Sequence, residues 1–368
     1  MAEAEPAPSV LLTVSGEIDP AIHERIVRGE RPRADYLEMA RGFNADLLDY
    51  RAARAGGGVV GRLVERFAGS NALLAWMCWK KRAQYRVVMT DGEQIGIPFS
   101  VLLKLFGRGA RATRHAMIVH TLSVGKKMLF FDRFGIQSHV DRFIVYSTWQ
   151  KDFIEKRWHV EPARVVLSPF MVDDAFFSSM HLASKSVDRD RPLICAVGLE
   201  RRDYATLMDA VRDLPIDVVI AAASPWSKQD DTTRHAEIPV NVTVRKFTQY
   251  ELRQLYADAA FLVMPLYPVT FQAGVTAILE AMAMERAVIC SLIPGQTDVI
   301  DDGVQGVYVR AEDPDALRTA IERLVNDPGT AVRMGRAGRQ LIEGKMNLDH
   351  YVTRLRAQVH ALAESPLP

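Results

Sequence analysis

The segment from Met264 to Cys290 contains the residues best suited to chemistry. A buried-strand pattern leads into a loop with Gly274, and a helix pattern with Glu280 follows. The first N–H groups of a helix have no intrahelical acceptor and carry partial positive charge, so the backbone at Gly274, Val275 and Thr276 suits a phosphate. Glu280, one to two turns further on, could accept two hydrogen bonds from a vicinal diol such as that of a ribose. The alternative is a loop-to-helix turn with an exposed carboxylate.

Short apolar runs alternate with longer amphipathic runs along the chain, as is typical of parallel sheets covered by helices. In the first half we predict strands at 9–14, 45–50, 85–90, 116–120 and 142–146, and helices at 61–82, 98–106 and 148–158. In the second half we predict strands at 192–197, 217–222, 240–244, 260–265 and 287–291, and helices at 204–211, 249–257, 276–284, 314–325 and 329–342.

This pattern predicts two doubly wound α/β domains, Rossmann-like in type, over residues 1–180 and 181–347. The polar stretch 180–191 is the expected linker, and a last helix within 348–368 is expected to pack back on the first domain. Ligands of such sheets bind beyond the carboxyl ends of the strands, which predicts a site in a cleft between the two domains.

Composition excludes several classes of protein. The chain has 368 residues, 48% of them hydrophobic, and a net charge of +1, which argues against a dedicated nucleic-acid binder. Its three cysteines are far apart, so neither a disulfide framework nor a metal-ligand spacing is expected. Neither a signal peptide nor a membrane-spanning run is recognisable in the sequence. We expect a cytoplasmic protein, with peripheral contact to the inner membrane face left open.

The second half resembles the C-terminal domain of retaining, nucleotide-sugar-dependent glycosyltransferases of the GT-B fold, in the group called family 4. The signature of that family is a Glu, seven residues, and a second Glu followed by Ala-Met-Ala. This chain has Gln272, seven residues, and then Glu280-Ala281-Met282-Ala283. Further similar motifs follow the family's order, at Ser168–Phe176, Ala196–Tyr204, Phe247–Ala257, Pro294–Gly306 and Glu312–Leu324. The likeness covers residues 140–345 well and the first 130 weakly.

The resemblance implies a GT-B fold with two domains facing a cleft. It also implies a nucleotide-diphosphate sugar as co-substrate, no further cofactor and no obligatory metal. In such enzymes the second signature Glu binds the ribose and the first faces the donor sugar, a position where Gln272 keeps hydrogen-bonding capacity but has no charge. Fixed positive charge must stabilise the departing diphosphate, a role open to Arg201, Arg202 or Lys246. A solvated turn is the alternative for the two arginines.

The implied site includes residues from both domains. The candidate catalytic residues are His120, Gln272 and Arg201. The candidate substrate-binding residues are Gly16, Arg202, Lys246, Gly274, Val275, Thr276 and Glu280. His120 is preferred over His115 as the histidine that contacts the donor sugar in this family, with a core histidine as the alternative. Gly16 ends a predicted strand, where a glycine lets the backbone approach a phosphate, and an ordinary turn is its alternative.

Two runs in the first half have more than one interpretation. Gly56–Gly61 matches G-x-G-x-x-G but lacks the acidic residue that a dinucleotide site needs further on, so we interpret it as a flexible loop. Leu73–Trp79, followed by Lys80-Lys81-Arg82, fits either a segment resting on an anionic membrane or a buried helix with a basic last turn. We favour the buried helix.

The predicted function is transfer of a sugar, with retention of configuration, from a nucleotide-diphosphate donor to a small-molecule, glycan or lipid acceptor. Gln272 motivates the alternative of a non-catalytic sugar-nucleotide-binding protein or partner subunit. An epimerase or phosphorylase on the same fold is a further alternative that no residue specifies. Asp230-Asp231 is expected to be an exposed loop rather than an Asp-x-Asp metal motif.

Overall fold

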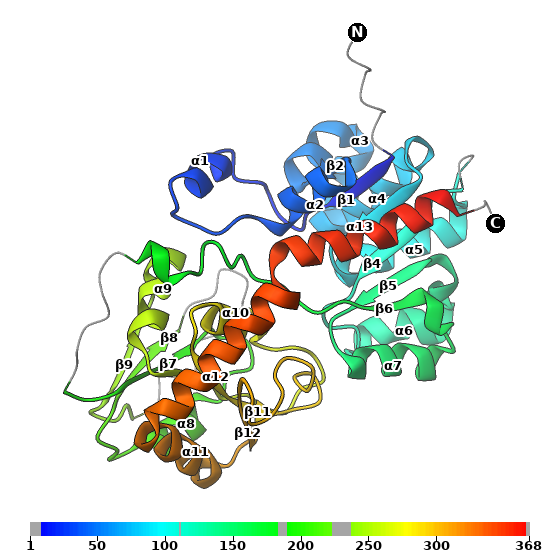
Figure 1. Cartoon of the computed structure of the whole chain (residues 1–368). Coiled ribbons are helices and arrows are strands. Elements are labelled where there is room, and N and C mark those ends of the chain that lie inside the picture. The colour runs from blue at the N-terminus through cyan, green and yellow to red at the C-terminus, as the bar shows by residue number, and fades with distance from the viewer. Residues whose placement is uncertain (1–8, 110–111, 183–189, 223–236, 366–368) are drawn as a thin grey trace. The chain divides into compact units, whose positions relative to one another are not determined.

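A computed structural model describes residues 9–109, 112–182, 190–222 and 237–365. The chain divides into two compact units, each with its own parallel sheet (Figure 1). Unit 1 comprises residues 1–23, 34–168 and 351–368, and unit 2 comprises residues 24–33 and 169–350. The chain therefore passes from one unit to the other four times. The linker predicted at 180–191 and the Asp230-Asp231 loop lie partly or wholly outside the described residues.

Unit 1 is built on a six-stranded parallel sheet of order β2-β1-β3-β4-β5-β6. Its strands are β1 Val10–Thr13, β2 Ala45–Leu48, β3 Val87–Thr90, β4 Arg114–Ile118, β5 Arg142–Val145 and β6 Val165–Leu167. The strand order reverses between β1 and β3, so the loops after these two strands diverge to opposite faces of the sheet. A crevice at the carboxyl ends of β1 and β3 is the position where doubly wound sheets bind ligands.

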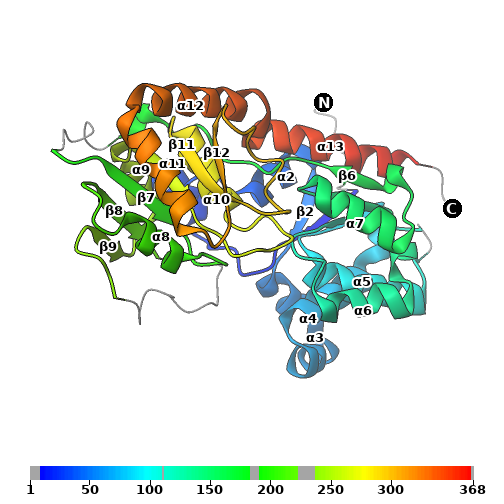
Figure 2. The same ribbon diagram turned by 90° about the horizontal axis from the view of Figure 1, so that it is seen from below.

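The helices of unit 1 cover both faces of its sheet. They are α2 Asp35–Phe43, α3 Tyr50–Ala68, α4 Ser70–Lys81, α5 Glu93–Phe106, α6 Gly125–Phe134, α7 Thr148–Trp158 and α13 Leu348–Glu364, while the short α1 Ile22–Val27 spans the first crossing between the units. Figure 2 shows α3, α4, α5 and α6 on one side of the strands and α13 on the other. A Cβ on Gly42 of α2 would lie 2.5 Å from Val352 of α13, so these two helices pack closely together.

The C-terminal helix α13 is anchored to unit 1 by polar contacts along its length. The hydroxyl groups of Tyr351 and Tyr146 are 3.0 Å apart. Arg354 donates to the Ser168 hydroxyl, and Arg86 donates to the carbonyl of Ala363. These contacts join α13 to residues that border β5, β6 and β3, much earlier in the sequence.

Unit 2 has a second six-stranded parallel sheet, of order β12-β11-β10-β7-β8-β9. Its strands are β7 Leu193–Val197, β8 Asp217–Ala221, β9 Val242–Arg245, β10 Phe261–Met264, β11 Ala287–Leu292 and β12 Gly306–Arg310. Its helices are α8 Tyr204–Val211, α9 Gln249–Asp258, α10 Val275–Ala283, α11 Pro314–Asn326 and α12 Pro328–Leu341. The two sheets confirm the predicted pair of doubly wound α/β domains.

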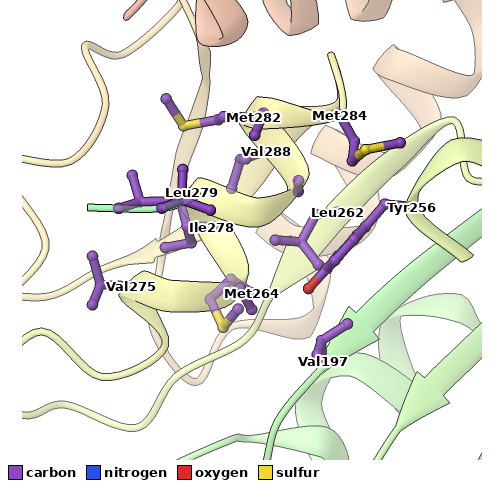
Figure 3. Packing of buried hydrophobic residues seen from close by; sticks show 14 of the residues in the cluster. Val197, Tyr256, Leu262, Met264, Val275, Ile278, Leu279, Met282, Met284 and Val288 are labelled. Carbon is purple, nitrogen blue, oxygen red and sulfur yellow. The ribbon is translucent and has the colours of Figure 1, made fainter. Parts of the chain in front are cut away.

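Two hydrophobic clusters cover the two faces of the unit 2 sheet. Figure 3 shows the cluster that packs α10 against the strands, with Tyr256 beside Leu262 and Met264, and with Ile278 and Leu279 pointing from the helix. α10 is apolar around most of its circumference, and its buried residues include a carboxylate. A helix this enclosed is held rigidly by its neighbours.

Several predicted elements of unit 1 were wrong, for local reasons. Gly56–Gly61 is part of helix α3, with non-helical angles only at Gly58, and is not a loop. The predicted helix 61–82 is two helices, because Gly69 has a φ of 84° and ends the first one. Helix α5 starts at Glu93, and Pro98 lies inside it. The sequence reading missed α1, α2, α6 and β6 in the first half and β12 in the second.

The Leu73–Trp79 run is the buried helix that we favoured. Leu73, Leu74, Met77 and Cys78 are at most 1% exposed and form the core beneath β3 and α5. Among the described residues, no helix is both long enough and apolar enough to cross a membrane. The same residues contain no group of three or more His, Cys, Asp or Glu side chains that could hold a metal ion.

The packing of α12 on the turn after α10 gives a test of the fold. A Cβ on Gly335 would lie 2.0 Å from the backbone oxygen of Glu285, so we expect Gly335→Ala to reduce the free energy of unfolding by about 1–3 kcal/mol. Gly344→Ala is the control, since its Cβ would meet no atom within 4 Å. Urea unfolding midpoints measure both variants, and equal midpoints for the two would contradict this packing.

Candidate functional site

The candidate site of unit 2 lies where its strand order reverses. Strands β7 and β10 are neighbours in the sheet, but the chain leaves β7 toward β8 on one side and leaves β10 toward β11 on the other. The loops after these two strands therefore separate at their carboxyl ends and leave room for a ligand. The loop after β7 holds Arg201 and Arg202, and the loop after β10 holds Gln272 and Gly274.

Backbone hydrogen bonds join these two loops. Asp203 N–H donates to the carbonyl of Pro265, and Tyr267 N–H donates to the carbonyl of Arg201, each at 3.1 Å. Arg202 and Leu266 form an isolated antiparallel bridge at the same place. The pairing forces Arg201 into left-handed angles, with a φ of 57°. As a result the two adjacent arginines have different surroundings.

The Arg202 side chain is buried, and the negative charge of Glu200 offsets the effect of burial only in part. Arg202 is 5% exposed, and its guanidinium donates hydrogen bonds to the backbone carbonyls of Val197 and Glu200. Among the described residues, no carboxylate forms an ion pair with it. Burial therefore lowers the pKa of Arg202, because the charged form loses solvation. A buried guanidinium without a counter-ion provides a site for an anion.

The guanidinium of Arg202 lies next to the start of helix α10. A Cβ on Gly274 would lie 3.0 Å from Nη2 of Arg202 and 2.7 Å from the sulfur of Met264. Gly274 caps the helix in left-handed geometry, with a φ of 81°, which a side chain would oppose. Val275 is buried behind this turn, and Thr276 is exposed. The partial positive charge of the helix start thus adds to that of Arg202.

Glu280 lies inside unit 2 and is not an exposed carboxylate. It is 6% exposed, and its Oε2 accepts a hydrogen bond of 2.7 Å from the hydroxyl of Tyr256. Burial raises the pKa of Glu280 to about 7, although the hydrogen bond from Tyr256 opposes the shift. The phenol comes from α9, so a second helix fixes the direction of the carboxylate.

The remaining candidates of unit 2 lie at the same edge of its sheet. Gln272 is half-buried in the loop just before Gly274, and Lys246 is exposed immediately after β9. Arg201 is exposed on its turn. The sequence reading missed Gln296, which follows β11, is fully buried and donates from Nε2 to the carbonyl of Ala273. Its Oε1 is buried without a hydrogen-bond partner.

The candidates of unit 1 follow two of its strands. Gly16 comes after β1, and its carbonyl accepts a hydrogen bond from Tyr50 N–H. A Cβ at Gly16 would meet no atom within 4 Å, so no protein atom there requires a glycine. His120 comes after β4, and its Nε2 lies 3.6 Å from Oδ1 of Asp91, which follows β3.

Acidic groups surround His120. Although burial lowers the pKa of the imidazole, the contact with Asp91 and the negative charges of Asp91, Glu93 and Asp35 raise it above its usual value overall. Glu93 also fixes the backbone, because it accepts hydrogen bonds from the N–H groups of His120 and Thr121. Burial, followed by repulsion from Asp91, raises the pKa of Asp35 to about 6.

The structure brings Arg202, Gly274 and the start of α10 together, and it separately brings His120 to Asp91. His115 is a core histidine, buried between Ser100 and Thr90 with both ring nitrogens in hydrogen-bond contact. The sequence reading did not identify Tyr256, Asp91 or Asp35 as part of a site. The position of Asp91-Gly92 at the end of a predicted strand could have identified Asp91. The carboxyl ends of parallel strands meet at one edge of a sheet, which brings Asp91 close to His120 at the end of another strand.

Comparison with known proteins places the second sheet in a family. A family model described as "Glycosyl transferases group 1" matches residues 192–327. Over 177 residues the chain is 32% identical to an alpha-maltose-1-phosphate synthase of Mycobacterium tuberculosis, a match that covers 43% of this chain and 45% of that protein. It is 28% identical over 141 residues to a D-inositol 3-phosphate glycosyltransferase of Kribbella flavida, covering 36% and 32% of the two chains. The matched region is thus less than half the length of these relatives.

Solved structures share the fold of the chain. Sucrose-phosphate synthase from Thermosynechococcus elongatus superposes with a TM-score of 0.71 at 18% identity, over 96% of this chain and 98% of that one. Anabaena HepE in complex with UDP superposes with a TM-score of 0.71 at 11% identity, over 96% and 99%. Both likenesses establish the GT-B architecture of two parallel α/β sheets.

The buried carboxyl of Glu280 makes stability depend on pH. Its folded pKa of about 7 lies above the ordinary 4.5, so ionisation favours the unfolded chain as pH rises between these values. We expect the unfolding free energy of the wild type to fall relative to that of Glu280→Gln from about pH 5 to about pH 8. Urea denaturation at both pH values tests this, with Glu322→Gln on α11 as a control for loss of one carboxylate. Parallel pH curves for wild type and Glu280→Gln would contradict the assigned burial.

The contact between His120 and Asp91 gives a second titration. Asp91→Asn removes the neighbouring negative charge and its contact with the ring, so we expect the pKa of His120 to fall. The imidazolium stabilises the folded protein below the ordinary histidine pKa, and this stabilisation is lost as pH rises through the raised value. NMR titration of the ring protons, assigned with His120→Gln, measures the change. Asp152→Asn, at an exposed position of α7, should leave the resonance unchanged, and an equal shift in both variants would refute the pairing.

Proposed function

Because residues 192–327 form a group 1 glycosyltransferase domain within a GT-B fold, we propose that the chain is a retaining glycosyltransferase. It moves a sugar from a nucleotide-diphosphate donor, bound by unit 2, to an acceptor bound by unit 1. The acceptor is a small molecule, a glycan or a lipid.

The proposal rests on the buried guanidinium of Arg202 at the start of α10. A diphosphate placed there would receive hydrogen bonds from the first N–H groups of the helix. It would also balance a charge that forms no ion pair with any carboxylate in the described ranges. The departing nucleoside diphosphate gains negative charge in the transition state, which the same groups stabilise. Because positive charge is already fixed at this point, the proposed transfer does not require a metal ion.

Glu280 is the proposed ligand of the ribose. Tyr256 donates one hydrogen bond to Oε2, so Oε1 and the remaining lone pair of Oε2 are left to accept from the two diol hydroxyls. Only the ionised carboxylate accepts from a diol with both oxygens, so we expect ribose binding to lower the pKa of Glu280 from about 7. Lys246, exposed after β9, and Arg201, exposed after β7, are further proposed phosphate contacts.

A UDP-sugar is the first donor to test. Anabaena HepE, which has a similar fold, was solved in complex with UDP and in complex with UDP-glucose. These two structures support binding of a uridine nucleotide at this edge of the sheet. Gln272 stands where family members have a Glu that faces the donor sugar, so we propose that the transferred sugar, more than the nucleotide, distinguishes this chain. In unit 1, His120 is the proposed catalytic contact to the sugar, and Gly16 is the proposed point of close backbone approach to the donor phosphate.

Nucleotide binding tests the proposal. We expect one of UDP, GDP, dTDP and ADP to raise the melting temperature, since a ligand that binds only the folded state stabilises it. Arg202→Gln should weaken binding of that nucleotide, measured by calorimetry, by at least about tenfold, because one charge-assisted contact is lost. Lys246→Ala, at an exposed position, should weaken nucleotide binding less. Arg212→Gln, at the half-buried residue just after α8, is the matched control.

Transfer itself is tested with nucleotide sugars and EDTA. We expect release of nucleoside diphosphate in the presence of EDTA and a product with the donor's anomeric configuration. Strict metal dependence or an inverted product would refute the mechanism. Tight nucleotide binding without transfer from any donor would assign the chain to a non-catalytic binding role, and gain of transfer in Gln272→Glu would then identify the cause.

A further inference from the structure

The exposed apolar side chains of unit 1 are concentrated on one face. On helix α3, the side chains of Val59, Val60, Leu63 and Phe67 are 64%, 54%, 50% and 82% exposed. Every other large apolar residue that the structure describes as exposed in unit 1 lies at the end of α5 or on α6 and the residue before it. Figure 2 shows α3, α5 and α6 on the same side of the sheet. We call this set of residues the apolar face.

The geometry of α3 explains why its apolar residues point outward. Gly61 packs on α4, where a Cβ would lie 3.2 Å from Leu73 and 3.3 Å from Trp76. Residues four apart share one side of a helix, so Val59, Leu63 and Phe67 form a stripe on the side turned away from Gly61. The glycine lets the two helices approach closely, and the stripe stays exposed in the described part of unit 1.

The remaining part of the apolar face has the same character. Leu105 and Phe106 at the end of α5 are 68% and 60% exposed. On α6, Leu129 and Phe134 are 51% and 57% exposed, with Phe130 between them at 37%. Single exposed apolar residues are ordinary, but their concentration on helices that cover one side of a sheet indicates an interaction surface.

The segment of the chain that contains the helices of the apolar face is strongly basic. Residues 50–134 contain fifteen of the chain's 46 Lys and Arg residues but only four of its 45 Asp and Glu residues. Arg62 and Arg66 are exposed beside the stripe on α3, and Lys126 and Arg133 are exposed on α6. This local excess of basic residues contrasts with the chain's net charge of +1.

Each of the four acidic side chains in this segment is already close to a basic partner. Glu65 pairs with Arg54 and Asp132 pairs with Arg157. Glu93 binds Lys127, and Asp91 lies beside His120. The positive charge of Arg62, Arg66, Lys126 and Arg133 is thus not offset by these carboxylates.

We propose that the apolar face of unit 1 docks on the surface of an anionic lipid bilayer. Exposed Phe, Leu and Val side chains insert among the lipids, while the flanking arginines and lysines bind anionic headgroups. Nucleic acid fits less well, because the aliphatic stripe on α3 would gain nothing from a phosphate backbone. A second copy fits less well, because two faces of the same positive charge repel each other. The proposal does not depend on the proposed function.

Vesicle sedimentation tests the proposal without donor or acceptor. The full chain is mixed with phosphatidylcholine vesicles, with or without about 30% phosphatidylglycerol, at low salt and at about 0.5 M NaCl. We expect binding to the anionic vesicles, weakened by salt, and little binding to the neutral ones. Arg62→Gln with Arg66→Gln should weaken partitioning by about fivefold for each charge removed.

The apolar part is tested with Leu63→Ser combined with Phe67→Ser, which should weaken binding by at least about tenfold. Leu129→Ser combined with Phe134→Ser tests α6 independently. The control is Val240→Ser with Val332→Ser, at exposed positions of unit 2, which should bind as the wild type does. Unchanged melting temperatures and nucleotide binding show that the variants fold.

Three outcomes would overturn the proposal. The first is the absence of binding to anionic vesicles at low salt. The second is a Leu63→Ser, Phe67→Ser variant that binds vesicles as the wild type does but no longer self-associates in sedimentation velocity, which would assign the face to a second copy. The third is wild-type binding to a DNA duplex that is tighter than vesicle binding and unaffected by that variant. Loss of transfer activity with intact vesicle binding would count only against the proposed function.

Discussion

The buried charge of Arg202 is the constraint on which the candidate site depends. A guanidinium at 5% exposure without a carboxylate partner is costly, and its hydrogen bonds to two backbone carbonyls satisfy only some of its donors. Gly198 and Gly274 have left-handed backbones around it, where a side chain on either residue would press against the guanidinium. The reversal of strand order, the bridge from Arg202 to Leu266 and the start of α10 all converge on this group.

The alternation of strands and helices was readable from the sequence because both sheets are parallel and buried. Thr148–Trp158 and Tyr204–Val211 begin and end where their patterns indicated. Gly56–Gly61 misled the sequence analysis, because glycine weakens a helix locally but here lets α4 pack against α3. The packing of α3 against α4 outweighs the low helix propensity of these glycines. The local sequence does not indicate this packing.

The sequence located the loops of the candidate site but not the environment of each side chain. Adjacent arginines look alike in a sequence, yet a left-handed turn at Arg201 exposes one and buries the other. Glu280 could equally have faced solvent, and its burial against Tyr256 depends on where α9 lies. Asp91 and His120 follow different strands, so their contact becomes visible only once the order of β3 and β4 is known.

The four crossings of the chain between the units impose an order on synthesis. Helix α13 belongs to unit 1 but is translated after every strand of unit 2. Until it emerges from the ribosome, Tyr146 lacks its hydroxyl neighbour, and α2 has an uncovered surface at Gly42. The half of the protein made first is therefore finished last, and a nascent chain carries an incomplete first sheet while the second one assembles.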